Sequence, residues 1–217
     1  MQNKKTVVIT LVVLVLLFIG AIIGFNKSKS NNIEALAKTN SKGAPFTREH
    51  SPKFGDNKKS VIITEFTDPE CPACRAFHPA IYNIYKEYYE DVQLVIRYLD
   101  NHKNSEYVIK ILEASRLQHK YKEVNELVFK YQPAWSSKTN PNPSLLWTYL
   151  ANIEGLDVKK LREDFDTIDI SEILELDRKD ATTLGVRGTP AFFVNGKKLD
   201  NLIYQEFLDL VESEIYK

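Results

Sequence analysis

Apolar residues dominate the start of the chain. Residues 7–25 carry no charge, and only Thr10, Gly20 and Gly24 interrupt the apolar run. A helix of this length spans about 29 Å at about 1.5 Å per residue, which matches the hydrocarbon thickness of a bilayer. We therefore predict an N-terminal membrane anchor in residues 1–27. A cleaved signal peptide is the alternative, although its apolar region is usually shorter.

A polar segment and then a strand–helix–strand pattern follow. Residues 28–60 are rich in Ser, Asn, Lys and Pro and predict a stalk and N-terminal extension. The β-branched run at 61–66 predicts a buried strand, and residues 92–99 predict a second one. Between them, apolar positions recur at helical spacing. Because a helix connects the two strands, we expect them to be parallel in a βαβ unit.

The β pattern disappears between residues 100 and 183, where apolar spacing predicts a block of helices. The predicted segments are 106–119, 122–131, 144–153, 158–165 and 172–183. The β pattern returns at Ala191-Phe192-Phe193-Val194, and Asn195-Gly196 predicts a two-residue hairpin turn before a final amphipathic helix. This order predicts an α/β fold in which residues 61–99 and 184–217 form one sheet domain. The helical domain at 100–183 is inserted into it.

Composition narrows the classes of function. The chain has 217 residues, of which 29 are basic and 29 are acidic, and 43% are hydrophobic. These values are typical of a globular protein and exclude a disulfide-dense scaffold. Without the apolar N-terminal segment, whose charges are Lys4 and Lys5, the remaining chain is slightly acidic. Binding of nucleic acid by counterion release needs a basic face, so we expect no nucleic-acid partner.

The two cysteines, Cys71 and Cys74, lie at the junction between the first predicted strand and the helix. A disulfide that closes so small a loop removes little entropy from the unfolded chain, which argues against a purely structural bridge. Zinc would need further ligands; His78 could supply a third, but the chain has no second cysteine pair. We therefore expect no metal and no cofactor, and favour a redox-active pair.

The start of a helix favours a thiolate at the first cysteine. Unpaired backbone N–H groups and the helix dipole lower the pKa of a thiol there. A lowered pKa makes Cys71 both a ready nucleophile and a good leaving group. Cys74, one helical turn further, is expected to be less exposed and to resolve a mixed disulfide. Pro72 and Ala73 between them are expected to tune the couple.

A second signal lies far downstream, at Gly188-Thr189-Pro190. A proline is excluded from the middle of a strand but fits at its start, where this one precedes the hairpin strand. With a cis bond between Thr189 and Pro190, this segment can present an unpaired backbone edge beside the cysteines. The alternative is an ordinary trans proline in a turn.

Together these segments resemble the thioredoxin superfamily, and within it the DsbA-like extracytoplasmic thiol–disulfide oxidoreductases. The resemblance rests on Glu65-Phe66-Thr67-Asp68-Pro69-Glu70-Cys71-Pro72-Ala73-Cys74 and on Gly185-Val186-Arg187-Gly188-Thr189-Pro190-Ala191-Phe192-Phe193-Val194-Asn195-Gly196. It covers about residues 46–217 and implies a thioredoxin-like fold with an inserted helical domain. It also implies Cys71 as the nucleophile, Cys74 as the resolving cysteine, and a cis Pro190 that binds substrate backbone together with Thr189.

The resemblance implies roles for two further residues, and the sequence also departs from the family pattern at some positions. Glu65 matches a buried acid that assists proton transfer, and Pro79 matches the proline that kinks the active-site helix. Between the cysteines, however, Pro-Ala replaces the Pro-His of strongly oxidising members and the Gly-Pro of thioredoxin. Ala73 cannot stabilise a thiolate, and Glu70 adds a negative charge next to Cys71. We therefore expect a couple less oxidising than the family's extreme of about −120 mV.

Redox chemistry decides the expected compartment, because disulfides persist outside the cytoplasmic membrane. We predict a single-pass membrane protein whose catalytic domain lies on the extracytoplasmic side, in a periplasm or its equivalent, as a monomer. It would exchange disulfides with cysteines of exported polypeptides, as an oxidase, and a redox partner would recycle it. The alternatives are a disulfide reductase or isomerase with few clients, and a non-catalytic, holdase-like peptide-binding module.

Overall fold

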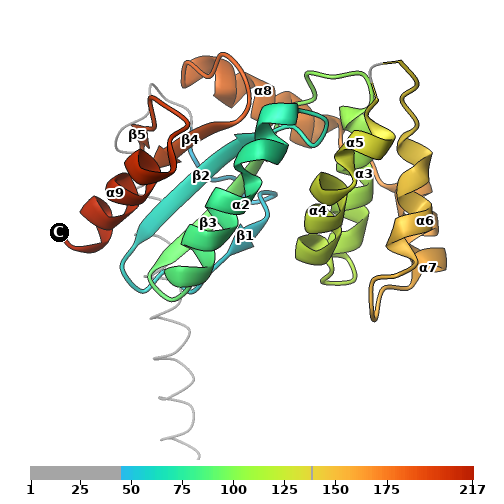
Figure 1. Ribbon diagram of the computed structural model, residues 1–217, viewed down its shortest axis with the longest axis horizontal. Helices are drawn as coiled ribbons and strands as arrows, with labels where there is room; N and C mark the ends of the chain where they lie inside the picture. The colour runs from blue at the N-terminus through green and yellow to red at the C-terminus, as the bar shows by residue number, and fades with distance from the viewer. Residues whose placement is uncertain (1–44, 138) are drawn as a thin grey trace, which may run out of the picture.

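The computed structural model describes residues 45–137 and 139–217; the predicted anchor at 1–27 and the first part of the predicted stalk lie outside the described residues. Within these residues a five-stranded mixed sheet has the order β1-β3-β2-β4-β5 (Figure 1). Strands β2 and β3 are parallel, as predicted, and the other neighbours are antiparallel. The strands are β1 Lys53–Phe54, β2 Val61–Thr67, β3 Val92–Tyr98, β4 Ala191–Val194 and β5 Lys197–Lys198.

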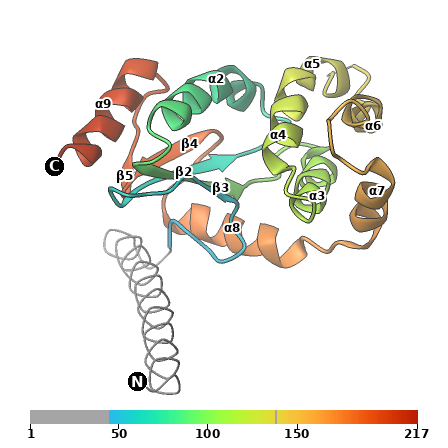
Figure 2. The same cartoon turned by 90° about the horizontal axis from the view of Figure 1, so that it is seen from below.

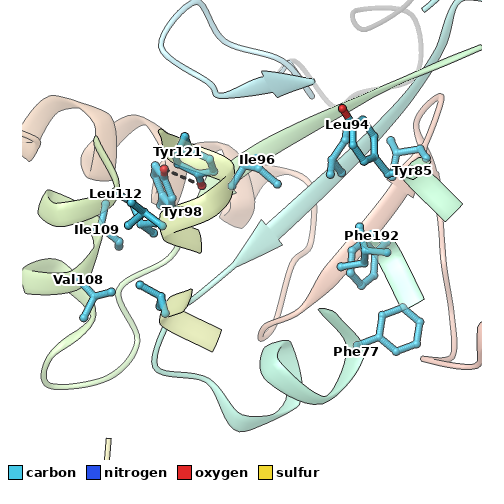
Figure 3. Close-up of a cluster of buried hydrophobic side chains, with 14 of the residues drawn as sticks. Phe77, Tyr85, Leu94, Ile96, Tyr98, Val108, Ile109, Leu112, Tyr121 and Phe192 are labelled. Atoms are coloured by element: carbon cyan, nitrogen blue, oxygen red, sulfur yellow. Dashed lines mark hydrogen bonds between the residues drawn. The ribbon is translucent and has the colours of Figure 1, made fainter. Parts of the chain in front are cut away.

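Helices cover both faces of the sheet, which explains why every residue of β2 is buried (Figure 2). Helices α2 (Pro72–Glu87) and α9 (Tyr204–Ile215) lie on one face, and α8 (Ser171–Thr183) lies on the other. On the first face, the ring of Phe192 packs against Phe77 of α2 and Phe207 of α9, at 5.3 and 5.0 Å between centroids (Figure 3).

The remaining helices form a block beside the β1–β3 side of the sheet (Figure 1). They are α3 Ser105–Arg116, α4 Tyr121–Lys130, α5 Gln132–Trp135, the 3₁₀ turn η1 Pro143–Leu145, α6 Leu146–Leu150 and α7 Val158–Thr167. One hydrophobic core runs from the sheet into this block. Within it, the hydroxyl of Tyr98 on β3 lies 2.9 Å from that of Tyr121 on α4 (Figure 3). The same hydroxyl lies 2.7 Å from Glu113 Oε1 on α3.

Helix α8, which the sequence groups with the insertion, packs on the sheet. Its Asp177 and Asp180 bind the fully buried guanidinium of Arg97 on β3, at 2.7 and 2.5 Å. The described part of the predicted stalk also belongs to the fold: β1 pairs with β3, and the Phe46 ring lies 5.0 Å from that of Phe193. The predicted unit boundaries at 28–60 and 100–183 stay predictions.

The predicted hairpin is confirmed. Strands β4 and β5 pair antiparallel, and the turn residues Asn195 and Gly196 both have positive φ, 47° and 82°. This backbone twist matches that of the flanking strands and is the reason why Asn-Gly is favoured there. No helix in residues 45–137 and 139–217 combines the length and apolarity needed to cross a bilayer.

Candidate active site

The cysteine pair lies at the beginning of α2. Cys71 has an extended backbone, and Pro72 begins the helix, where a proline loses no hydrogen bond. Both cysteines are free thiols, and Cys71 is 6% exposed whereas Cys74 is fully buried. The predicted difference in exposure is therefore confirmed. Pro72 and Ala73 are exposed beside them.

The downstream proline segment lies against the first cysteine. The Thr189–Pro190 bond is cis, which confirms the isomer implied by the resemblance. The sulfur of Cys71 lies 3.2 Å from the carbonyl oxygen of Thr189. Strand register causes this approach: Ala191, the first residue of β4, pairs with Phe66 near the end of β2. Residues more than a hundred positions apart therefore meet at one end of the sheet.

The pKa values of the two thiols are shifted in opposite directions. The pKa of Cys71 is lowered to about 5, mainly by a hydrogen bond from the Cys74 thiol. Burial opposes this change, and hydrogen bonds from the side chain of Thr189 and from the backbone N–H groups of Ala73 and Cys74 reinforce it. The pKa of Cys74 is strongly raised, first by burial and then by its bond to Cys71. Cys71 is therefore a thiolate at neutral pH while Cys74 keeps its proton.

Glu65 is buried in β2, as the resemblance implies. Its side chain is 4% exposed, and burial raises its pKa to about 7. The charge of Glu65 contributes to the raised pKa of Cys74, so the two groups interact. Pro79 lies inside α2, also as implied. A buried acid that titrates near neutrality beside a thiol can accept or donate that thiol's proton.

The side chain of His78, the candidate third zinc ligand, packs against an aromatic ring. Its ring lies 4.7 Å from that of Phe129, and burial lowers its pKa to about 4. Phe129 also belongs to one buried cluster with the two cysteines. In the part of the chain that the structure describes, no group of three or more His, Cys, Asp and Glu side chains is placed to hold a metal ion.

Sequence reasoning missed Asp68, whose side chain holds the cysteine loop in place. Asp68 is fully buried, and its carboxylate accepts four hydrogen bonds. They come from Glu70 N at 2.8 Å, Ser105 Oγ at 2.6 Å, Asn101 N at 2.9 Å and His102 Nδ1 at 2.7 Å. Three of the four donors belong to the connection between β3 and α3 and the start of α3, so this carboxylate joins two loops. The sequence contained one signal for the role of Asp68: it lies two residues before Glu70, close to the cysteines.

Two further residues of the helical block hold the same loop. The carboxylate of Glu70 accepts hydrogen bonds from the backbone and side-chain amides of Asn104, at 2.6 and 2.7 Å. The sequence suggested a free negative charge beside Cys71. In the structure, the residue at the start of α3 binds this carboxylate instead. Gln132 of α5 donates to the carbonyl oxygens of Pro69 and Cys71, at 2.8 and 3.0 Å. Loop 68–71 is thus shaped by residues of the helical block.

The sequence matches the thioredoxin family over residues 47–213, and the chain belongs to that family. It is 26% identical over 202 residues to disulfide bond formation protein D of Bacillus subtilis, an alignment that covers 88% of this chain and 85% of that protein. The crystal structure of oxidised BdbD from Bacillus subtilis superposes with a TM-score of 0.68 at 23% identity. It covers 78% of this chain and 95% of that one.

A different relative contains a similar segment within a much longer protein. The Na⁺/H⁺ antiporter NhaA of Herminiimonas arsenicoxydans is 27% identical over 145 residues, which are 67% of this chain and 22% of the antiporter. The chain thus spans about a fifth to a quarter of the length of the antiporters that it matches.

Proposed function

We propose that this protein is a thiol–disulfide oxidoreductase that oxidises cysteines of exported polypeptides. One observation carries the proposal: the acidic thiol of Cys71 lies beside the buried thiol of Cys74 and the cis Thr189–Pro190 segment. The name of the Bacillus subtilis relative, disulfide bond formation protein D, supports the same activity.

The proposed reaction begins with the Cys71–Cys74 disulfide. A substrate thiolate attacks the sulfur of Cys71, the disulfide breaks, and Cys74 leaves and takes a proton, for which Glu65 is the proposed donor. A second substrate thiolate then attacks the substrate sulfur of the mixed disulfide and expels Cys71 as a thiolate. Two substrate thiols become one disulfide, and their two electrons remain on the Cys71–Cys74 dithiol until a redox partner removes them.

The residues around the cysteines have proposed roles in this sequence. Thr189 and Pro190 bind the backbone of the extended substrate beside the sulfur of Cys71. Pro72 and Ala73 tune the couple and, since they are exposed, leave the first cysteine open to attack. No metal or cofactor takes part in the proposed steps.

The direction of exchange follows from the pKa of the leaving thiol. A thiol with a pKa of about 5 is a good leaving group, and its ionised form stabilises the reduced protein, which favours oxidation of the substrate. A reductase or isomerase is the alternative, favoured by a reduction potential near the roughly −270 mV of thioredoxin.

The proposal includes a cellular location. Residues 7–25 would anchor the chain, as a monomer, with the redox domain on the extracytoplasmic side, where its exported substrates are. Residues 28–60 would connect the anchor to the thioredoxin-like domain of 61–99 and 184–217, and 100–183 would be the helical insertion.

Trapping tests the function. We expect Cys74→Ser to accumulate mixed disulfides with exported polypeptides, because its Cys71 thiolate still attacks a disulfide of the polypeptide, which is the last proposed step in reverse, and no Cys74 thiol is present to attack Cys71 and release the adduct. Non-reducing electrophoresis and mass spectrometry would detect these adducts. Cys71→Ser is the matched control and should trap none. The proposal is wrong if Cys74→Ser forms no adducts and the wild-type protein exchanges no disulfide with a reduced peptide. A peptide-binding module would instead keep its function in the Cys71→Ser/Cys74→Ser double variant.

A further inference from the structure

Two buried carboxylates lie next to the sulfur that becomes an anion. Asp68 is fully buried and Glu70 is 9% exposed, and both precede Cys71 in one turn, closed by a hydrogen bond from Cys71 N to Asp68 O at 3.0 Å. A neighbouring negative charge disfavours a thiolate. A positive charge placed on these carboxylates would offset them and favour the thiolate.

One side chain is placed to supply this positive charge. The Glu70 carboxylate accepts hydrogen bonds from the neutral backbone and side-chain amides of Asn104, and three donors to Asp68 are also neutral. The fourth donor is the imidazole of His102, 2.7 Å from Asp68 Oδ2. Among the ion pairs of residues 45–137 and 139–217, His102 is the one cationic partner of these two carboxylates.

We propose that His102 is a positioning residue whose imidazolium, held on Asp68, offsets the two carboxylates of the loop and thereby keeps Cys71 a thiolate. The inference rests on the proposed redox role of Cys71 and Cys74. The positive charge thus comes from the connection between β3 and α3. The two residues between the cysteines, Pro72 and Ala73, are uncharged.

The environment of His102 suits this role. Partial burial lowers the pKa of the imidazole, but the hydrogen bond to Asp68 and the charges of Asp68, Cys71 and Glu70 outweigh it and raise the pKa above its usual value. The side chain is 40% exposed, so the ring exchanges protons with solvent. His78, although it lies on the same helix as the cysteines, is held neutral by burial and cannot supply the charge.

The coupling is reciprocal, which gives a spectroscopic signature. If the imidazolium stabilises the thiolate, the thiolate stabilises the imidazolium by the same free energy. Oxidation of Cys71 to a disulfide removes the anion. The pKa of His102 should therefore be higher in the reduced than in the oxidised wild-type protein, as histidine NMR resonances of the full-length chain would record.

Substitution at His102 separates charge from structure. His102→Gln keeps a donor for Asp68 and removes the charge, and His102→Lys replaces the charge. The measurement is the rate of iodoacetamide alkylation at Cys71 against pH, located by mass spectrometry. We expect the midpoint to rise by about one pH unit in His102→Gln, which is about tenfold in the acid dissociation constant of the Cys71 thiol, and to return toward wild type in His102→Lys. His119→Asn, at the other end of α3, is the control and should match wild type.

The results also distinguish this inference from the proposed function. Equal alkylation midpoints in wild type and His102→Gln would overturn the role of His102, as would equal His102 titrations in the two redox forms. The disulfide-exchange proposal would survive either result, provided that Cys74→Ser still traps substrates. Conversely, an absence of exchange would overturn the function, while the alkylation midpoints would still decide whether His102 and Cys71 are coupled.

Discussion

Cys71 and Cys74 are the same residue type, one helical turn apart, and their surroundings give them opposite acidities. The first accepts hydrogen bonds from the second and from the start of α2, and the second is fully buried near a carboxyl group. The predicted thiolate at Cys71 thus agrees with the structure, but the largest contribution comes from Cys74 and not from the backbone. At this scale, environment decides chemistry more than residue type does.

Glu65 offers a prediction at the residue scale. Its pKa in the folded protein, about 7, lies above the ordinary value of 4.5, so its contribution to stability is fully present below pH 4.5 and is lost as the pH rises toward 7. Glu65→Gln should therefore gain stability relative to wild type over this range, by up to about 3 kcal/mol. Urea unfolding at a series of pH values measures the difference.

The same variant should slow disulfide exchange, since the proposed proton partner of Cys74 is missing. Glu87→Gln, on the exposed side of α2, is the control and should change neither property. Parallel stability curves for Glu65→Gln and wild type between pH 4.5 and 8 would contradict the assignment.

At the scale of elements, the helical block positions the redox loop. Asn104 and Ser105 at the start of α3, and Gln132 on α5, bind the segment 68–71 directly. The block is therefore part of the site's construction and not only a cover for it. Helix α5 itself is four residues long and begins next to Pro133, which is why helical periodicity alone does not reveal it.

Gln132→Ala tests this connection. The substitution leaves the buried carbonyls of Pro69 and Cys71 without their side-chain donor, which should destabilise the fold by about 1–3 kcal/mol and slow exchange by loosening the loop. Gln118→Ala also removes two side-chain hydrogen bonds, both with the backbone of Asp157 at an exposed site, and should change stability by less than about 1 kcal/mol. Equal effects of the two variants in urea unfolding would argue against a specific role for α5.

At the scale of the whole molecule, the acidic thiol links stability to redox state. A thiol whose pKa falls from 9.0 to about 5 on folding stabilises the reduced protein fully above pH 9, and this contribution is lost as the pH falls through 5. The stability contribution of Glu65 has the opposite pH dependence. Because Glu65 is present in both redox forms, its contribution cancels to first order in the stability difference between the reduced and oxidised protein.

The reduced form should therefore unfold at a higher temperature than the oxidised form at pH 7, by a margin that shrinks as the pH falls toward 5. Calorimetry of the full-length protein in both forms measures this margin, and Cys71→Ser controls for effects of pH elsewhere. A margin that stays constant or grows on acidification would contradict the proposed thiolate and, with it, the oxidising direction.

Local chemistry made several parts of this protein predictable from the amino-acid sequence. Strand and helix periodicity predicted β2, α2 and β3, and Asn195-Gly196 predicted the hairpin, because side-chain spacing and turn geometry act over a few residues. The cysteine spacing at a strand–helix junction likewise indicated the redox pair.

The distant groups that meet around this pair were visible first in the folded chain. The bonds from His102 and Ser105 to Asp68 and from Gln132 to Cys71 join residues 34, 37 and 61 positions apart. β1 has two residues, and its pairing with β3 decides its place in the sheet. Such contacts follow from the packing of whole elements, for which no short stretch of sequence carries a signal, and they hold in place the loop that leads into Cys71.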